Sequence, residues 1–442
     1  MMEHNISFVP QNALCTACGA CSAVCGKKAV SIEENAAGYL SARVDAQECV
    51  NCGLCRTVCP SVPKNQTISN VSATLRGSCL ESFIGYATDK MLRREGQSGG
   101  VVTALLLYLL ESGRINGAIT NRFDPERRAS VAQYATDRQA LLESVGSYYV
   151  QSPVVQTVEQ IPKGDKSAAV VLGCQAEALR MMERQGIPVP DYLIGLVCEG
   201  TYSRQMISDM IASTDCPLDE QPQRFRFRYS HPAYGGWPGN ALLVTDKHRY
   251  RIDKSVRFAL KPLYESYRCL LCYEQINTQA DLVCGDPWGI PGDHFSGETV
   301  VTARTEKGLA LLKDAQAAGY LTLTPLDTEL FIRGQAIDTQ IRTNVSAGYV
   351  CSQKHQWAYP YTVTNEAAQS FSAVSAKEKK GYERRLLYTR ARCLAHDEME
   401  LHTLESAYRA ELEQQAHRNA QKARIKKPFH AVRFVIRKLR RK

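Results

Sequence analysis

The chain lacks any apolar run of eighteen residues, so no segment predicts a membrane-spanning helix. Its first residues, MMEHNISFVPQNALC, also lack the basic stretch followed by an apolar stretch that marks a secretory signal. We therefore expect a cytoplasmic protein, in which thiols stay reduced. Seventeen cysteines in a reducing compartment favour metal or redox chemistry over disulfide bonds.

Two common nucleotide-binding motifs are missing as well. No G-x-G-x-x-G follows a candidate strand, and no G-x-x-x-x-G-K-[ST] occurs anywhere in the chain. The first absence excludes the standard NAD fingerprint, and the second excludes the usual nucleotide-hydrolysis loop. Any cofactor must be bound by another arrangement.

Acidic residues are absent from the last part of the chain, 418–442, which holds 11 Lys and Arg. The net charge of the whole chain is +9, so the remainder carries −2 and gives no indication of nucleic-acid binding. Apolar residues recur at helical spacing in this tail: Phe429, Val432, Val435, Ile436 and Leu439. The pattern is typical of a basic amphipathic helix on an anionic membrane surface, with a solvated tail as the alternative. We expect peripheral contact with the inner face of the membrane.

What the chain does have is a repeated cysteine pattern. Cys-x2-Cys-x2-Cys-x3-Cys occurs twice within the first 60 residues, and such a run provides three ligands to one 4Fe-4S cluster and its fourth to the other. The pattern predicts Cys15, Cys18, Cys21 and Cys59 around one cluster, and Cys49, Cys52, Cys55 and Cys25 around a second. Structural zinc is the alternative, although zinc sites usually use two Cys-x2-Cys pairs. Gly26 stands after Cys25, where this motif usually has proline, whereas Pro60 keeps the usual form.

The organisation along the chain predicts an α+β or α/β multidomain protein. A two-cluster ferredoxin-type domain over 1–64 is followed by a linker-like stretch at 61–78. An α/β module follows in two parts, 80–165 and 166–345, and a helical extension over 366–442 ends the chain. Strands are predicted over 83–88, 117–123, 168–174, 191–200, 241–246 and 298–305, and a helix over 306–319. The strand, glycine turn, helix and strand over 83–123 suggest a βαβ-like unit.

The glycine turn QSGG opens a strongly apolar helix. Ser98 is the predicted N-cap, and Gly99 and Gly100 would expose backbone N–H groups at the positive end of the helix. This is the form of an anion-binding helix start. The alternative is a tight turn into a core helix.

A second group of cysteines lies far from the first. Cys269 and Cys272 form a Cys-x2-Cys pair, and Cys174 and Cys198 each end a candidate strand. These four would hold a third 4Fe-4S cluster or a zinc ion, whereas lone cysteines are otherwise small core residues. Cys284 is a further candidate ligand.

Several segments between about residues 80 and 330 resemble the coenzyme F-420 hydrogenase/dehydrogenase beta-subunit family. QSGGVVTALLLYLLESGRINGA resembles its hallmark, and GSYYVQSPV its G-S-K-Y segment. VLGCQAEALR resembles G-T-P-C-Q-x-x-x-L-R, and LIGLVCEGTYS resembles L-x-C-x-G-T-x-S. FRFRYSHPAYGGWPG and RCLLCYEQINTQADLVCGDPWG resemble the two motifs that follow in the family. Any one of these matches is weak, but six in the family's order are highly specific.

The resemblance implies a module with bound FAD and a nearby 4Fe-4S cluster, whose relatives use deazaflavin or pigment substrates. By position, Ser98, Gly99, Gly100 and Thr103 would contact the phosphates of the flavin, with Gly146 and Ser147 near the cofactor. Cys174, Cys198, Cys269 and Cys272 would hold the third cluster. Many bacterial relatives belong to polysaccharide-biosynthesis systems, and this chain resembles that branch.

Three departures from the family pattern concern the site. Tyr148 stands in place of the lysine of G-S-K-Y. The residues Val171, Leu172 and Gly173 stand in place of G-T-P before the first cysteine, and Glu199 stands where the family usually has a polar residue after the second cysteine. Loss of that lysine puts the use of an anionic deazaflavin in doubt.

Together these features predict an iron–sulfur flavoprotein oxidoreductase that exchanges electrons with a donor or acceptor protein and with an unidentified organic substrate or deazaflavin-like coenzyme. One alternative is an electron-transfer subunit without substrate chemistry of its own, and another is a scaffold that uses its clusters structurally. His231 and His294 are candidate acid or base residues in exposed loops, although each is more often structural or solvent-facing. No general acid or base is assigned from the sequence.

Overall fold

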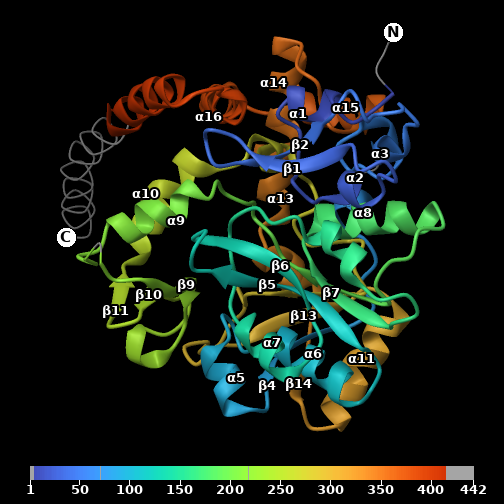
Figure 1. Ribbon diagram of the computed structural model, residues 1–442, viewed down its shortest axis with the longest axis vertical. Coiled ribbons are helices and arrows are strands. Elements are labelled where there is room, and N and C mark those ends of the chain that lie inside the picture. The colour runs from blue at the N-terminus through green and yellow to red at the C-terminus, as the bar shows by residue number, and fades with distance from the viewer. Residues whose placement is uncertain (1–3, 70, 218, 415–442) are drawn as a thin grey trace, which may run out of the picture.

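The centre of the protein is a mixed eight-stranded β-sheet (Figure 1). The structure is a computed structural model that describes residues 4–69, 71–217 and 219–414. In spatial order the strands are β14 (Leu321–Leu326), β4 (Ser82–Ala87), β13 (Thr299–Ala303), β12 (Leu282–Gly285), β8 (Tyr192–Leu196), β7 (Ser167–Val171), β5 (Gly117–Asp124) and β6 (Ala129–Ala135). Strands β5, β7, β8 and β12 run parallel, and the strands outside them are antiparallel to their neighbours.

The parallel strands are buried on both faces, as strands of such sheets usually are. Helices α6 (Val101–Glu111) and α11 (Glu306–Ala317) share one apolar core with residues of one face of the sheet. Helix α8 (Gly173–Arg184) and the 3-10 helix η2 (Val154–Gln160) share another core with the opposite face. The short helices α5 (Lys90–Glu95) and α7 (Arg138–Glu143) lie beside α6. The predicted α/β class is confirmed by these layers.

The strands follow the sequence predictions to within a few residues, but their connections differ. Strand β4 pairs with β13 and β14, whereas β5 pairs with β6 and β7, so the expected βαβ unit over 83–123 does not form. The parallel partners of β5 are instead provided by residues further along the chain. Strand β7 ends at Val171 and β8 at Leu196, so Cys174 lies in α8 and Cys198 lies in the loop after β8.

A smaller sheet stands beside the large one. It contains β9 (Pro222–Tyr229), β10 (Asn240–Thr245) and β11 (Arg249–Ile252), all antiparallel. Its apolar core is shared with α9 (Gln205–Ala212) and α10 (Lys254–Tyr264). Strand β9 carries the FRFRY segment, whose two phenylalanines and two arginines are all buried.

The N-terminal segment is small and depends on the rest of the chain for its core. It contains α1 (Phe8–Gln11), α2 (Ala20–Ala23), α3 (Leu54–Thr57) and a hairpin of β1 (Val30–Glu34) with β2 (Leu40–Val44). Its apolar residues belong to the same core as residues of the C-terminal helices. The stretch expected to be a linker contains η1 (Pro63–Asn65), β3 (Thr67–Ile68) and α4 (Val71–Arg76), and β3 pairs with β15 (Thr362–Val363).

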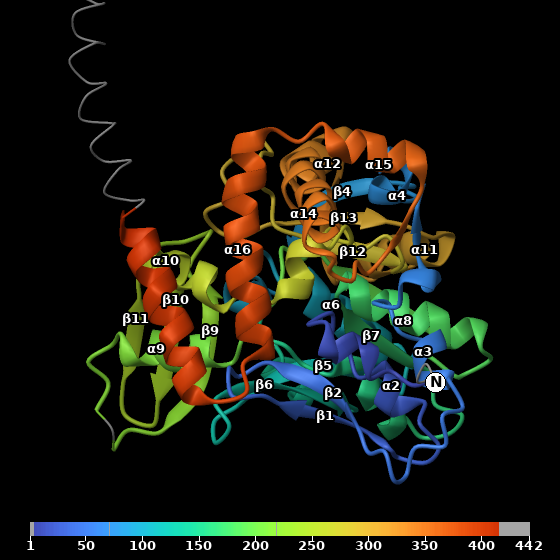
Figure 2. The same ribbon diagram turned by 90° about the horizontal axis from the view of Figure 1, so that it is seen from above.

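The C-terminal part is helical, as predicted. Its elements are α12 (Thr328–Gly334), α13 (Ile337–Gln340), the π-helical turn η5 (Ile341–Ser346), α14 (Ala347–His355), α15 (Asn365–Ser372) and α16 (Ala376–Leu394). A further helical stretch, 398–414, turns back beside α16 (Figure 2). The stacked rings of Tyr388 and Tyr408, one from each helix, have centroids 3.8 Å apart. The predicted amphipathic tail, 418–442, lies outside the described residues. Among the helices that are described, none is both long and apolar enough to cross a membrane.

Candidate iron–sulfur and flavin sites

The two N-terminal cysteine repeats have the same backbone form. Ala17 and Gly19 in the first repeat have φ angles of 57° and 87°, and Asn51 and Gly53 in the second have 53° and 82°. Each repeat then enters a short helix that carries its third cysteine, α2 in the first case and α3 in the second. The left-handed residues at matching positions fold the backbone tightly, so three thiols of each repeat lie within one loop.

The first predicted ligand set comes together in space. Cys15, Cys18, Cys21 and Cys59 all line one small cavity, together with apolar side chains of the N-terminal segment. Burial raises the pKa of Cys21 well above its usual value, and the nearby thiols raise it further. The fourth thiol therefore arrives from the second repeat, as the alternating pattern predicts.

The second predicted set lies closer to the surface. Burial raises the pKa of Cys55, and the thiols of Cys52, Cys49 and Cys25 add to the effect. Cys52 is exposed, whereas Cys55 is buried. Cys55 is also among the thiols that raise the pKa of Cys21, so the two sets are neighbours.

Backbone N–H groups point at several of these sulfurs. In each case the donor stands two residues after the cysteine: Ala17 to Cys15 at 3.4 Å, Ser61 to Cys59 at 3.4 Å, and Glu274 to Cys272 at 3.3 Å. Such hydrogen bonds stabilise negative charge on sulfur, and they influence the reduction potential of a bound cluster.

The third cysteine set also converges, from three separate elements. Cys174 lies in the first turn of α8, Cys198 follows β8, and Cys269 and Cys272 lie in and just after the 3-10 helix η4 (Tyr267–Leu271). Burial raises the pKa of Cys174, and so do the thiols of the other three. Burial likewise raises the pKa of Cys272 to about 11, against the opposing effect of a nearby arginine.

The third set adjoins the first. Cys18 is one of the thiols that raise the pKa of Cys174, second in effect only to Cys272 among the charged neighbours. Helix α2, which follows Cys18, contacts both α3 of the second repeat and α8, and Cys18 shares an apolar core with Ala176 and Ala178 of α8. The three sets are therefore neighbours in space.

No three Cys, His, Asp or Glu side chains in the described ranges are placed so as to hold one metal ion. In a 4Fe-4S cluster each thiolate binds a different iron, so ligands of a cluster are neighbours without sharing one ion. The absence of such a group among the described residues therefore leaves open which thiols bind a cluster, and the structure shows only that the thiols of each set are neighbours.

The surroundings of the first and third sets fit negatively charged clusters. Arg268, only 1% exposed, directly precedes Cys269 of the third set and donates to Ser61 and Pro60, which follow Cys59 of the first set. Its Nη1 has no hydrogen-bond partner among the described residues. Within the described part of the chain, no carboxylate oxygen lies within salt-bridge distance of this guanidinium. A buried cation requires a compensating negative charge. A cluster with four thiolate ligands carries one, so the residues present fit this cofactor.

Three other candidates from the sequence lie apart from these sets. Cys284 is buried in β12 within the core of the large sheet, and burial alone raises its pKa to about 12. His294, expected in an exposed loop, is instead buried, and its two ring nitrogens lie 2.6 Å from Glu298 and 2.9 Å from the Ile290 carbonyl. His231 accepts a hydrogen bond from the backbone of Ala233 and caps η3 (Pro232–Tyr234). Both histidines therefore have structural contacts.

The QSGG turn differs from its prediction in one respect. Gly100, not Ser98, is the N-cap of α6, and no side chain caps this helix. Gly99 and Gly100 have φ angles of 108° and 76°, which favour glycine. Packing also requires them, because a Cβ on Gly100 would lie 2.5 Å from the carbonyl of Leu92. The prediction of Ser98 as the cap is wrong because the left-handed glycine turn extends the loop to Gly100.

The other predicted flavin contacts lie in the helix that follows this turn and in a second loop further along the chain. Thr103 is buried in the first turn of α6, and Gly146 and Ser147 form part of the loop after α7. A hydrogen bond of 3.1 Å from Gln97 to the hydroxyl of Tyr149 joins the two loops. The structure therefore places the QSGG turn and the 146–149 loop side by side.

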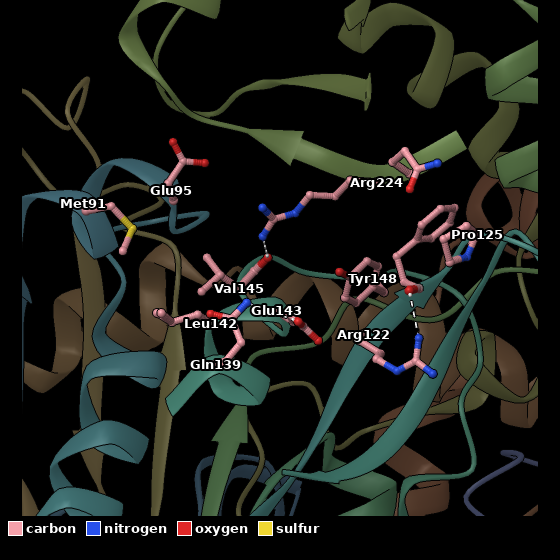
Figure 3. A pocket seen from close by; sticks show the side chains of 12 residues that line it. Met91, Glu95, Arg122, Pro125, Gln139, Leu142, Glu143, Val145, Tyr148 and Arg224 are labelled. Carbon is pink, nitrogen blue, oxygen red and sulfur yellow. Dashed lines mark hydrogen bonds between the residues drawn. The ribbon is translucent and has the colours of Figure 1, made fainter. Parts of the chain in front are cut away.

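A cavity of about 400 Å³ opens next to the 146–149 loop (Figure 3). Its walls come from α5, β5, α7 and β9. The lining residues are Met91, Glu95, Arg122, Phe123, Pro125, Gln139, Leu142, Glu143, Val145, Tyr148, Gln223 and Arg224. None of the six predicted flavin contacts lines it, although Val145 and Tyr148 flank Gly146 and Ser147 in the chain.

The cavity has two arginines without acidic partners. Arg122 and Arg224 donate only long hydrogen bonds, of 3.5 and 3.4 Å, to the carbonyls of Phe123 and Val145 (Figure 3). Neither has a carboxylate within salt-bridge distance in the described part of the chain, although Glu95 and Glu143 also line the cavity. Burial raises the pKa of Tyr148, and the nearby arginines oppose that rise. The donor set fits an anionic group beside apolar surface.

Sequence reasoning did not identify Arg122, Arg224 or Arg268 as site residues. Arg268 directly precedes the Cys-x2-Cys pair, which was the available signal. The other two come from separate strands that meet only in the folded chain, so nothing in the local sequence marks them.

Fold and cysteine sets together define an iron–sulfur protein built on a mixed α/β module. Residues 82–159 and 164–329 match the N-terminal and C-terminal models of the "Coenzyme F420 hydrogenase/dehydrogenase, beta subunit", and residues 14–62 match a "4Fe-4S dicluster domain". The two beta-subunit matches cover more than half of the chain. The chain belongs to the coenzyme F420 hydrogenase/dehydrogenase beta-subunit family, with a 4Fe-4S dicluster domain in front.

The curated relatives include subunits of F420-dependent dehydrogenases and an F420-dependent reductase. The beta subunit of F420-dependent formate dehydrogenase 1 of Methanococcus maripaludis is 26% identical over 270 residues, which cover 59% of this chain and 66% of the relative. The coenzyme F420-dependent sulfite reductase of Methanocaldococcus jannaschii is 27% identical over 333 residues, 70% of this chain and 47% of the relative. The chain thus spans about half to two thirds of these relatives.

A solved structure has the same fold. It is a chain of the F420-reducing [NiFe] hydrogenase complex of Methanosarcina barkeri, with a TM-score of 0.50 and 20% sequence identity. The match covers 66% of this chain and 97% of the solved chain. This likeness confirms the fold of the beta-subunit module.

Proposed function

We propose that the chain is an iron–sulfur flavoprotein oxidoreductase that passes electrons between 4Fe-4S clusters and FAD, and on to an organic acceptor. The observation that carries this proposal is the packing of the Cys18 loop against α8, the helix that carries Cys174, which joins the N-terminal cysteine sets to the set in the beta-subunit module. The match to a dicluster domain supports the first two clusters. The match to the beta-subunit module supports an oxidoreductase role.

Twelve cysteines would hold three clusters. The first would use Cys15, Cys18, Cys21 and Cys59, the second Cys49, Cys52, Cys55 and Cys25, and the third Cys174, Cys198, Cys269 and Cys272. The exposure of Cys52 makes the second cluster the natural point of exchange with a protein donor or acceptor. The third set, which lies within the beta-subunit module, would lie next to the organic chemistry. Both directions of electron flow are compatible with this order.

FAD would supply the step that clusters lack, since a flavin accepts single electrons and transfers a hydride. Ser98, Gly99, Gly100, Thr103, Gly146 and Ser147 would bind it, as the family resemblance implies. The cavity beside the 146–149 loop would receive an anionic part of the flavin or of the acceptor, held by Arg122 and Arg224. These residues bind and orient, and no proton-transfer role is assigned to them.

The organic acceptor would be anionic. The names of the relatives include coenzyme F420, whereas this chain has Tyr148 at the position of the family's lysine. Arg122 and Arg224 lie beside Tyr148 and restore positive charge to the region. A deazaflavin-like coenzyme and another anionic substrate both fit this chemistry. The link to polysaccharide biosynthesis stays a prediction from the resemblance.

The second candidate function is an electron-transfer subunit that supplies a partner enzyme. It is favoured by the relatives, several of which are subunits of dehydrogenases or hydrogenases. In that case the clusters would function without a substrate bound to this chain. Contact of the 418–442 tail with an anionic membrane remains a prediction for either function.

Anaerobic purification followed by iron, sulfide and flavin analysis tests the proposal. We expect about twelve irons, matched by sulfide, and one FAD per chain. About eight irons without flavin would contradict the flavoenzyme and leave a two-cluster protein. Reduction of small acceptors by the purified protein with dithionite distinguishes the two candidate functions, since a pure transfer subunit needs its partner.

A further inference from the structure

Arg268 is a buried charge that lies beside two of the proposed cluster sites. Its side chain is among the largest that are fully buried, and it comes from η4, directly before Cys269. Two other buried arginines, Arg257 and Arg304, donate to backbone carbonyls. Three more have carboxylate partners: Arg226 pairs with Glu95, Arg228 with Asp286 and Arg392 with Glu405. Arg268 has no such partner among the described residues.

The polar contacts of Arg268 reach into the other module. Its Nε donates to the hydroxyl of Ser61 at 2.8 Å, and its Nη2 donates to the carbonyl of Pro60 at 3.4 Å. Pro60 and Ser61 directly follow Cys59, the fourth thiol of the first set. The guanidinium also lies over the ring of Tyr361, 4.9 Å from its centroid.

One nitrogen of this guanidinium is left without a partner. Nη1 is buried and donates no hydrogen bond to any described residue. A buried donor without a partner costs free energy, about 1–3 kcal/mol and more when it is charged. Such a donor persists where a ligand or charge offsets the cost. The thiols of Cys272 and Cys174 in the third set favour the charge of Arg268, and Arg268 in turn acts on Cys59 of the first set. The carboxyl of Glu177 favours it as well, although burial raises the pKa of Glu177 to about 8.

We propose that Arg268 is a fixed cation shared by the first and third clusters, and that it raises the reduction potentials of both together. This inference rests on the proposed function, because it requires both clusters. A one-electron reduction adds a negative charge to a cluster, so a nearby buried cation stabilises the reduced form. Because Arg268 lies beside both cysteine sets, its charge shifts both potentials in the same direction across the boundary between the N-terminal segment and the beta-subunit module. It is a positioning residue, not a ligand.

The test compares reduction potentials in the full-length protein, purified anaerobically with its clusters. Each cluster is titrated with dithionite under potential control and followed by its EPR signal. Replacement by a neutral side chain, Arg268→Gln, is expected to shift the one-electron reduction equilibrium of two clusters at least about tenfold toward oxidation, which equals about 59 mV. The second cluster, held by Cys49, Cys52, Cys55 and Cys25, is expected to keep its potential and serves as an internal reference.

Three further variants separate charge from structure. Arg268→Met also removes the charge but buries no polar atom, so it replaces the glutamine variant if that one does not fold. Arg268→Lys keeps the charge and is expected to shift both potentials less than the neutral variants do. Arg257→Gln removes another buried arginine, 8% exposed, that contacts the carbonyl of Phe227 in the small sheet, and should shift no potential.

Different results would contradict the role of Arg268 and the proposed function. Unchanged potentials in both neutral variants, equal shifts of all three clusters, or a lysine variant as shifted as the neutral ones would overturn the role of Arg268. Wild-type protein without a third cluster would instead contradict the proposed function.

Discussion

At the scale of single residues, Cys174 and Cys284 show how burial and neighbourhood separate two similar thiols. Cys174, in the first turn of α8, is half-buried, whereas Cys284 is buried in β12, and burial raises the pKa of each. Only Cys174 has other thiols nearby, namely Cys272, Cys18, Cys269 and Cys198. A buried thiol without such neighbours packs as a small apolar residue.

We therefore expect Cys174→Ser to lose or convert the third cluster, with up to about four fewer irons per chain, whereas Cys284→Ser keeps the wild-type iron content. Metal analysis and EPR spectra of the two purified variants check this. Equal iron content in both variants would show that Cys174 is not a ligand.

The arginines of the cavity allow a second prediction at this scale. Arg122→Ala and Arg224→Ala should each weaken FAD binding about tenfold, or about 1.4 kcal/mol, if the cavity receives the flavin's phosphates. Arg127→Ala, an exposed arginine in the turn between β5 and β6, is the matched control. Titration of flavin-depleted protein with FAD measures the effect. Wild-type affinity in both cavity variants would assign the cavity to another ligand.

At the scale of elements, the start of helix α6 is determined by backbone packing. Gly100 is left-handed, and the carbonyl of Leu92 occupies the space that a Cβ would need. Gly113, after the end of the same helix, is also left-handed, with a φ of 68°, but a Cβ there would meet no atom within 4 Å. The two glycines therefore differ in packing and share the backbone conformation.

Replacement of each by alanine separates these effects. Gly113→Ala should lower the free energy of unfolding by about 1 kcal/mol, the cost of a left-handed alanine. Gly100→Ala adds a clash with backbone and should lower it by about 2–4 kcal/mol in total. Chemical denaturation of the flavin-depleted variants measures both. An equal loss in the two variants would show that the contact with Leu92 is relieved at little cost.

Elements also show what the sequence could and could not predict. The cysteine spacing predicted the grouping of Cys15, Cys18, Cys21 and Cys59, because a tight loop leaves its fourth thiol facing the other repeat. Local patterns located the strands of the large sheet, but β4 and β5 are not neighbours, because pairing depends on contacts far along the chain. The N-cap was assigned to Ser98 because its residue type is a common cap, and the left-handed Gly100 overrode that preference.

At the scale of the whole molecule, the N-terminal segment and the beta-subunit module are packed into one common core. Residues of both, together with the C-terminal helices, form one apolar core, and β3 pairs with β15 across about 300 residues of chain. Separate domains were expected from composition, since the sequence does not show long-range packing. This union allows the first and third cysteine sets to lie side by side.

The shared core leads to a prediction about stability. Truncation after residue 355 removes β15, α15 and α16, and so exposes apolar residues of the N-terminal segment. We expect such a truncated chain to lose the N-terminal clusters and to aggregate, whereas removal of 418–442 alone should leave the iron content unchanged. Iron analysis and size-exclusion chromatography of the two truncated chains check this. Retention of all clusters in the shorter chain would show that the N-terminal segment folds independently.

The central claim is that the three cysteine sets form one path that leads to the flavin. The most direct measurement is the rate of flavin reduction after rapid mixing with dithionite, in the wild-type protein and in Cys198→Ser, with freeze-quench EPR of the N-terminal clusters. We predict that these clusters are reduced at the wild-type rate in the variant, while flavin reduction slows more than about tenfold. Flavin reduction at the wild-type rate without the third cluster would contradict the account.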